Sequence, residues 1–156
     1  MPIPGRCLCG EIRFEIEPPT EFCSHCHCQS CRLSHGAGFV TWTSVPEERF
    51  RLLHGAPRAY ASSARVSWLF CGNCGSSMFY RSTEAPGRIY LTAANLIGPL
   101  DREPDSHVSF EEHVGWIERA GELPRFQGKT SIPCPGRGTA PGLPPAPAPP
   151  GAADLL

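Results

Sequence analysis

Short runs of alternating or β-rich residues occupy most of the chain up to about residue 110. Residues 12–17 read Ile-Arg-Phe-Glu-Ile-Glu, and a period of two is typical of a strand with one buried face. Further runs are rich in β-branched and aromatic residues, which strands favour. These runs cover residues 39–45, 50–53, 65–70, 77–81, 88–92 and 107–110. Glycine and proline separate them, so the pattern predicts an all-β domain of short antiparallel strands.

Helical periodicity is much weaker. No part of the chain shows a sustained apolar period of about 3.6 residues, the pattern of an amphipathic helix. Residues 46–49 read Pro-Glu-Glu-Arg and are expected to form a turn or a single helical turn. Residues 32–38 are polar and contain glycine, which indicates a short connection.

The composition changes near Gly128. Residues 139–150 consist of proline, alanine and glycine apart from Thr139 and Leu143. Such a segment cannot bury enough apolar surface to offset the entropy lost on ordering. We therefore expect a folded domain over residues 1–127 and a disordered tail over residues 128–156. The tail contains Cys134, to which the sequence assigns no role.

Charge and the N-terminal residues narrow the function classes. The formal net charge is -1 at pH 7, and the 14 Lys and Arg residues are scattered. A nucleic-acid-binding surface normally shows a basic stripe instead. The first residues contain no apolar run or cleavage-site pattern, and no stretch is long and apolar enough to cross a membrane. We expect a cytoplasmic protein with no nucleic-acid or membrane partner.

The cysteines carry the candidate chemistry. The chain has nine of them, and in a reducing compartment closely spaced cysteines favour metal binding over disulfides. Residues 23–31 read Cys-Ser-His-Cys-His-Cys-Gln-Ser-Cys, a density of thiols and imidazoles that packing does not require but zinc prefers. Two remote pairs have the spacings C-x-C and C-x-x-C; they are Cys7/Cys9 and Cys71/Cys74. The second pair lies between two expected strands and is followed by Gly75, as in a zinc-knuckle hairpin.

The thiols can be divided in more than one way. In one partition a closed four-sulfur site ties the N-terminus to a central hairpin, with Cys7, Cys9, Cys71 and Cys74 as ligands. Cys26, Cys28 and Cys31 then form a three-sulfur site with an open coordination position, which distinguishes catalytic from structural zinc. In the alternative, Cys23 closes this second site, or a histidine caps it: His25, His27 or His35.

Three segments also resemble a known family. Residues 5–10 read Gly-Arg-Cys-Leu-Cys-Gly, residues 25–32 His-Cys-His-Cys-Gln-Ser-Cys-Arg, and residues 70–76 Phe-Cys-Gly-Asn-Cys-Gly-Ser. Their order and separation resemble the glutathione-dependent formaldehyde-activating enzymes, a family that includes centromere-protein-V-like proteins. The resemblance covers roughly residues 5–126. Cys23 is not part of the family motif.

The resemblance implies a fold and a chemistry. The fold is a zinc-bearing β fold of the Mss4-like, or β-tent, kind, with two zinc ions per chain. Cys7, Cys9, Cys71 and Cys74 match the structural zinc ligands, and Cys26, Cys28 and Cys31 match the second, catalytic zinc. The implied activity is that of a carbon–sulfur lyase that joins glutathione to formaldehyde, giving S-hydroxymethylglutathione.

A mechanism and two competing functions follow. A glutathione sulfur at the open zinc position would become a thiolate and attack a small electrophile. His27 and His35 are then either proton shuttles or residues that orient ligands. The first competitor is a non-catalytic interaction module with two closed zinc sites. The second is a thiol redox enzyme, which needs a reactive cysteine outside the metal ligands, Cys23 or Cys134.

Overall fold

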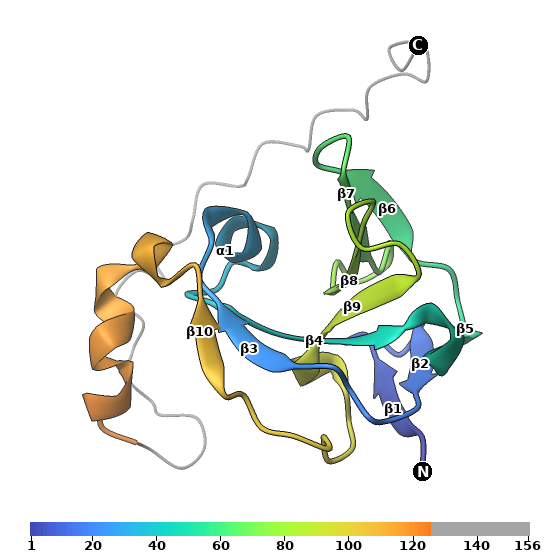
Figure 1. The fold of residues 1–156 in the computed structure, drawn as a ribbon, viewed down its shortest axis with the longest axis horizontal. Coiled ribbons are helices and arrows are strands. Elements are labelled where there is room, and N and C mark those ends of the chain that lie inside the picture. The colour runs from blue at the N-terminus through green and yellow to red at the C-terminus, as the bar shows by residue number, and fades with distance from the viewer. Residues whose placement is uncertain (126–156) are drawn as a thin grey trace, which may run out of the picture. The chain divides into compact units, whose positions relative to one another are not determined.

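The computed structural model describes residues 1–125 (Figure 1). It contains ten strands in this part of the chain: β1 Ile3–Arg6, β2 Arg13–Ile16, β3 Cys23–Cys26, β4 Val40–Pro46, β5 Phe50–His54, β6 Arg58–Ala61, β7 Val66–Phe70, β8 Ser77–Ser82, β9 Arg88–Thr92 and β10 Ser106–Val108. The helical segments are α1 Gln29–His35 and the 3-10 helices η1 Glu47–Arg49, η2 Ala93–Asn95, η3 Phe110–Glu112 and η4 Gly115–Glu122. The predicted all-β class is confirmed. The expected tail, residues 128–156 with Cys134, lies outside the described residues.

The strands form two sheets. One has the order β1-β2-β5, and the other has the order β10-β3-β4-β9-β8-β7-β6. The strand pairs are antiparallel, as expected, with the exception of β10 and β3, which run parallel. In Figure 1, β10 lies beside β3 at one edge of the long sheet after a connection from β9. Two parallel strands need such a long connection between them. The residue pattern within one strand therefore cannot show which distant strand it pairs with.

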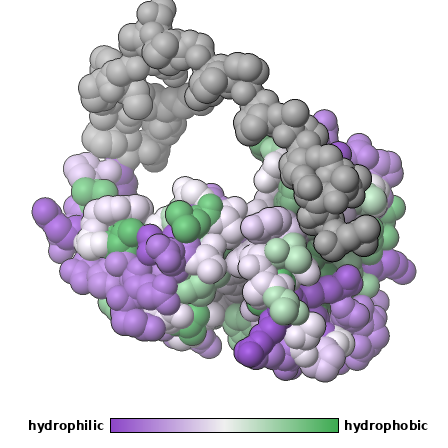
Figure 2. Space-filling view, turned by 90° about the horizontal axis from the view of Figure 1, so that it is seen from above, coloured by the Kyte–Doolittle hydropathy of each residue, from purple (hydrophilic) through white to green (hydrophobic). Residues whose placement is uncertain are grey.

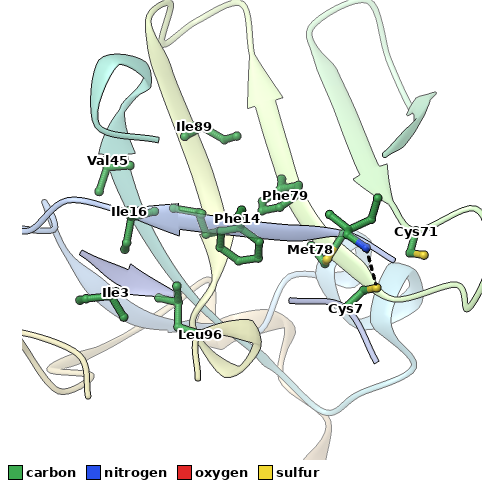
Figure 3. Close-up of a cluster of buried hydrophobic side chains, with 12 residues drawn as sticks. Ile3, Cys7, Phe14, Ile16, Val45, Cys71, Met78, Phe79, Ile89 and Leu96 are labelled. Atoms are coloured by element: carbon green, nitrogen blue, oxygen red, sulfur yellow. Dashed lines mark hydrogen bonds between the residues drawn. The ribbon is translucent and has the colours of Figure 1, made fainter. Parts of the chain in front are cut away.

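A hydrophobic core fills the space between β2 and the facing strands (Figure 3). Phe14 lies at its centre, 4.8 Å from Phe79 between ring centroids in an edge-to-face arrangement. Gly5 on the neighbouring strand packs on this ring, since a Cβ there would lie 2.2 Å from Phe14. Cys7 and Cys71 belong to the same cluster and lie at the end away from Ile3 and Val45. The core therefore extends to the two turns that carry Cys7 and Cys71.

Each predicted strand run contains or overlaps an observed strand, and residues 46–49 include the expected helical turn, η1. The strands that the pattern missed are β1, β3 and β6, and the helical segments that it missed are α1, η2, η3 and η4. All four residues of β6 are exposed, so this strand has no buried face that would give a recognisable pattern of apolar positions. The expected connection over residues 32–38 is wrong in its first half, because α1 continues to His35. Only Cys31 is buried in α1, so this helix has no apolar stripe.

One negative result concerns membranes. Among residues 1–125, no helix is both long and apolar enough to cross a bilayer.

Candidate functional site

Four thiols come together where two hairpins meet. Cys7 and Cys9 lie in the β1–β2 connection, and Cys71 and Cys74 lie in the β7–β8 connection. Their four sulfur atoms all lie within 4.8 Å of one another. Tetrahedral zinc with bonds of about 2.3 Å places its sulfurs about 3.8 Å apart, whereas a disulfide bond is about 2.05 Å long. The Sγ atoms of Cys7 and Cys9 are 3.5 Å apart, and those of Cys9 and Cys71 are 3.8 Å apart, so the spacing fits one metal ion.

Backbone hydrogen bonds shape this four-thiol cluster. The Cys71 amide donates to the Ser76 carbonyl at 2.9 Å, and the Gly75 amide donates to the Cys71 carbonyl at 2.9 Å. Gly75 has a φ of 76°, a left-handed conformation that glycine adopts without strain. On the other hairpin, the Ile12 amide donates to Cys7 Sγ at 3.2 Å, the dashed line in Figure 3. Such bonds favour the thiolate that a metal needs.

Burial makes the four-thiol cluster a structural element. Cys7 and Cys71 are almost fully buried, and Cys9 is the exposed member. The Asn73 side-chain amide donates to Cys9 Sγ at 3.3 Å and covers part of it. A metal held here would join the three-stranded sheet to the long sheet. A small β domain gains stability from such a crosslink.

The second group of thiols lies where β3 passes into α1. Cys26 ends β3, Cys28 caps α1, and Cys31 lies in its first turn. The three sulfur atoms lie within 4.8 Å of one another. Cys28 Sγ accepts a hydrogen bond from the Cys31 amide at 3.4 Å, as a serine oxygen does at many helix starts. The helix ends at Gly36, whose φ of 60° is left-handed.

This three-thiol cluster already favours one negative charge. A hydrogen bond with the Cys31 thiol lowers the pKa of Cys26 to about 6. The same hydrogen bond, together with burial, raises the pKa of Cys31. The Trp42 indole N–H donates to Cys31 Sγ at 3.3 Å, so a tryptophan holds this sulfur in place. One thiolate supported by its neighbours is an arrangement that attracts a cation.

Cys23 does not close the three-thiol cluster. Successive residues of a strand point to opposite faces, so Cys23 and Cys26, three apart on β3, face opposite sides. Cys23 is fully buried, and burial together with the nearby charge of Asp105 raises the pKa of its thiol. Among the described residues, the metal-binding group contains only Cys26, Cys28 and Cys31.

The histidines in and near the motif also have other partners. His25 Nδ1 lies 2.9 Å from Thr41 Oγ1, and His35 Nδ1 lies 3.1 Å from the Cys31 carbonyl oxygen. His27 is fully buried, and its Nε2 lies 2.8 Å from His107 Nδ1. Two histidines outside the motif, His107 and His113, also lie near His27. The parallel pairing of β10 with β3 places His107 opposite His25, and His113 stacks on Phe110 with ring centroids 4.3 Å apart.

A cavity of about 420 Å³ adjoins the three-thiol cluster. All three thiols line it, together with apolar side chains and serines: Phe22, Trp42, Val66, Trp68, Tyr80, Val108, Ser24, Ser30, Ser62 and Ser63. The lining residues come from β3, β4, α1, β7, β8 and β10, from the β6–β7 connection and from the residue before β3. Figure 2 views the molecule from above Figure 1 and shows several hydrophobic patches among polar residues on that face.

The aromatic walls of the cavity support one another. Trp42 and Tyr80 meet edge to face at 4.9 Å between ring centroids, and Tyr80 stacks on Tyr90 at 4.2 Å. The Trp68 indole N–H donates to Ser62 Oγ at 2.8 Å. Burial raises the pKa of the Tyr80 phenol, which therefore stays neutral. The strand alternation places Val66 and Trp68 on one face of β7. The pairing of Trp68 with Tyr80 on β8 shows that this face lines the cavity.

The two clusters and the two sheets define a class of protein: a small β domain with one cysteine cluster that joins the two sheets and one that lines a cavity with aromatic walls. A family model for the glutathione-dependent formaldehyde-activating enzyme matches residues 2–112. The chain belongs to this family, so the resemblance seen in the sequence is confirmed.

Individual relatives agree with this assignment. A Halomonas elongata protein with the provisional name glutathione-dependent formaldehyde-activating enzyme is 25% identical over 127 residues, which are 76% of this chain and 81% of that one. An uncharacterized lyase of Schizosaccharomyces pombe is 29% identical over 124 residues, 78% of this chain and 88% of that one. A Rhodobacter sphaeroides protein of known crystal structure has a similar fold, with a TM-score of 0.56 and 24% identity. The match covers 68% of this chain and 100% of that one.

Proposed function

We propose that this protein is a zinc-dependent carbon–sulfur lyase that joins glutathione, or a similar thiol, to formaldehyde or another small electrophile. The observation that carries the proposal is the cavity of about 420 Å³ beside the three-thiol cluster. A purely structural zinc site does not need a cavity beside it, whereas a reaction between two small molecules requires one. The family of the chain and the names of its relatives support a lyase.

The residues present fit two zinc ions with different roles. The first would bind Cys7, Cys9, Cys71 and Cys74, whose sulfur spacing suits a tetrahedral site. The second would bind Cys26, Cys28 and Cys31. When bound there, zinc would supply an open coordination position that lowers the pKa of a thiol.

The chain's own residues prepare this reaction. Trp42 fixes the Cys31 sulfur through its indole N–H, and the Cys31 amide fixes the Cys28 sulfur. The aromatic walls would shield bound substrates from part of the solvent, which strengthens polar interactions beside the thiols. In the reaction a bond forms between the thiol sulfur and the carbonyl carbon. The carbonyl π bond breaks, and the thiol proton ends on the carbonyl oxygen.

Adduct formation with labelled formaldehyde tests the proposal. Carbon NMR on the zinc-loaded protein should show faster exchange between formaldehyde and its glutathione adduct than the uncatalysed reaction. Cys26→Ser should lower this rate enhancement by at least about 100-fold, because it removes a metal ligand. Cys23→Ser is the matched control, since Cys23 is a buried cysteine of the same strand that faces away.

Two results would contradict the proposal. An unchanged rate in Cys26→Ser would remove the three-thiol cluster from the reaction. Loss of activity in Cys23→Ser alone would favour a thiol redox enzyme, although the buried and poorly ionised Cys23 does not suit that chemistry.

A further inference from the structure

We propose that the electrophile of this site is an uncharged aromatic aldehyde, of the size of benzaldehyde, rather than formaldehyde. This inference rests on the proposed function, because it names the second substrate of the same cavity. It is drawn from the volume of the cavity, the chemistry of its walls and the charge beside it.

The volume exceeds what formaldehyde needs. Formaldehyde has one carbon and one oxygen and is close in size to water, whose share of liquid volume is about 30 Å³. The cavity has a volume of about 420 Å³. Since an apolar cavity of about 150 Å³ is enough to bind benzene, this one has room for an aromatic ring and the sulfur end of a thiol. Formaldehyde together with the sulfur end of a thiol would leave much of the aromatic wall uncovered.

The walls favour an uncharged ligand. Among the described residues that line the cavity, none is Lys, Arg, His, Asp or Glu. A second cavity of about 540 Å³ shares Ser30, Ser62 and Trp68 with the first, and its described lining likewise contains none of these residues. Burying a carboxylate without a partner is costly, and three thiolates around one divalent ion would add a net negative charge. An anionic aldehyde is therefore disfavoured inside the cavity, and the carboxylates of glutathione would lie outside it while its sulfur end enters.

The aromatic side chains of the cavity favour a ligand that contains an aromatic ring. Trp42, Trp68 and Tyr80 surround the cavity and pack on one another, with centroid distances of 4.9 Å from Trp42 to Tyr80 and 5.6 Å from Trp68 to Tyr80. Both indole N–H groups are already used, on Cys31 and Ser62, so the rings offer carbon surface to a ligand. Aromatic rings prefer edge-to-face and offset contacts of this kind.

Serine hydroxyls complete the site beside the thiols. Ser24 lies two residues before Cys26 on the same face of β3, and Ser30 directly precedes Cys31. They can donate to a carbonyl oxygen while the ring lies against the tryptophans. The bond between the thiol sulfur and the aldehyde carbon then forms, the carbonyl π bond breaks, and the thiol proton moves to the oxygen to give a hemithioacetal.

Tryptophan fluorescence measures binding to this cavity without any reaction. The zinc-loaded protein with Trp116→Phe is suitable, because Trp116 is 64% exposed and would add background. We expect benzaldehyde to quench the cavity tryptophans on contact and to bind at least tenfold more tightly than 4-carboxybenzaldehyde, whereas formaldehyde should not quench them. Equal affinity for the neutral and the carboxylated aldehyde, or no binding of benzaldehyde, would overturn the inference.

A charge-introducing pair of variants locates the ligand. Ser30 is an exposed residue of α1 that lines the cavity, and its neighbour Gln29 does not. Ser30→Arg should improve the affinity for 4-carboxybenzaldehyde at least tenfold relative to benzaldehyde, while Gln29→Arg should leave the ratio unchanged. If both variants change the ratio equally, the ring does not occupy this cavity.

Adduct formation separates this inference from the proposed function. With glutathione or 2-mercaptoethanol as the thiol, kcat/KM for benzaldehyde should exceed that for formaldehyde at least tenfold. A preference for formaldehyde would overturn the inference and leave the lyase function in place. No acceleration with either aldehyde and either thiol would overturn the lyase function.

Discussion

The two thiol clusters contain the same ligand chemistry in opposite surroundings. Cys7 and Cys71 of the four-thiol cluster belong to the main core, and hairpins from both sheets enclose them. The three-thiol cluster lies at a strand-to-helix junction and borders a cavity. Thiolate number and surroundings both differ between the clusters. The comparison teaches that the number of thiols in a cluster and the residues packed around it together suit one cluster to joining the sheets and leave the other beside a cavity.

Breaking the four-thiol cluster should have the largest effect on stability. Cys71→Ser removes a fully buried thiol of the four-thiol cluster and would leave three thiols for the proposed structural zinc. Loss of a structural metal is among the most damaging single changes, so we expect the free energy of unfolding to fall by about 4 kcal/mol or more. Circular dichroism during heating measures it.

Cys23→Ala provides the control for that variant. Cys23 is equally buried but lies outside both clusters, so its loss should cost only about 1 kcal/mol. Equal destabilisation by Cys71→Ser and Cys23→Ala would show that the four-thiol cluster contributes packing alone and holds no metal.

Metal removal should sharpen the difference between the clusters. The three-thiol cluster offers three protein ligands, whereas the four-thiol cluster offers the four that complete a tetrahedral zinc site. A chelator should therefore extract zinc from the three-thiol cluster first. We expect the rates of zinc release to differ at least tenfold, with the fold intact after the first zinc has left. A colorimetric zinc indicator and circular dichroism, followed together, test this order. Simultaneous release and unfolding would contradict it.

Trp42→Phe should weaken only the three-thiol cluster. The variant keeps an aromatic ring but removes the N–H that donates to Cys31 Sγ. Loss of a partner that orients a ligand typically costs about 10-fold to 100-fold in metal affinity, and we expect the lower end. Competition with a chelator of known affinity measures it. Trp68→Phe is the control, because its N–H donates to Ser62 instead of to a thiol, and an equal loss there would contradict the assigned role of Trp42.

The smallest expected effect concerns the helix cap. In the metal-free protein, Cys28→Ala removes the side chain that accepts from the Cys31 amide, whereas Cys28→Ser keeps an acceptor. The two variants should differ by about 1 kcal/mol in the free energy of unfolding, with Cys28→Ser the more stable. Urea unfolding in the presence of a chelator measures this difference. Equal stabilities would show that the sulfur does not cap α1.

The strands and the thiol groups could be predicted because their signals are local. The alternation in residues 12–17 requires only one buried face, and the C-x-x-C spacing of Cys71 and Cys74 requires only one hairpin. The pairing of Cys7 and Cys71 came from the family resemblance and from ligand counting rather than from periodicity. The short helix α1 could not be predicted, because a cysteine caps it and only Cys31 is buried.

The cavity also could not be predicted from the sequence. Its walls depend on cross-strand register, which places Trp68 opposite Tyr80 and Tyr80 opposite Tyr90. The ambiguity over Cys23 had the same origin. Residues 23–26 form β3, and only that assignment shows that Cys23 faces away from Cys26.

Zinc analysis and zinc-edge X-ray absorption, with and without glutathione, test the central claim most directly. The account predicts two zinc ions per chain, one with an unchanging shell of four sulfurs. The other should have three protein sulfurs and gain a fourth when glutathione is added. Two zinc shells that both remain unchanged with glutathione would contradict an open thiol-binding site and would indicate a closed, non-catalytic zinc module.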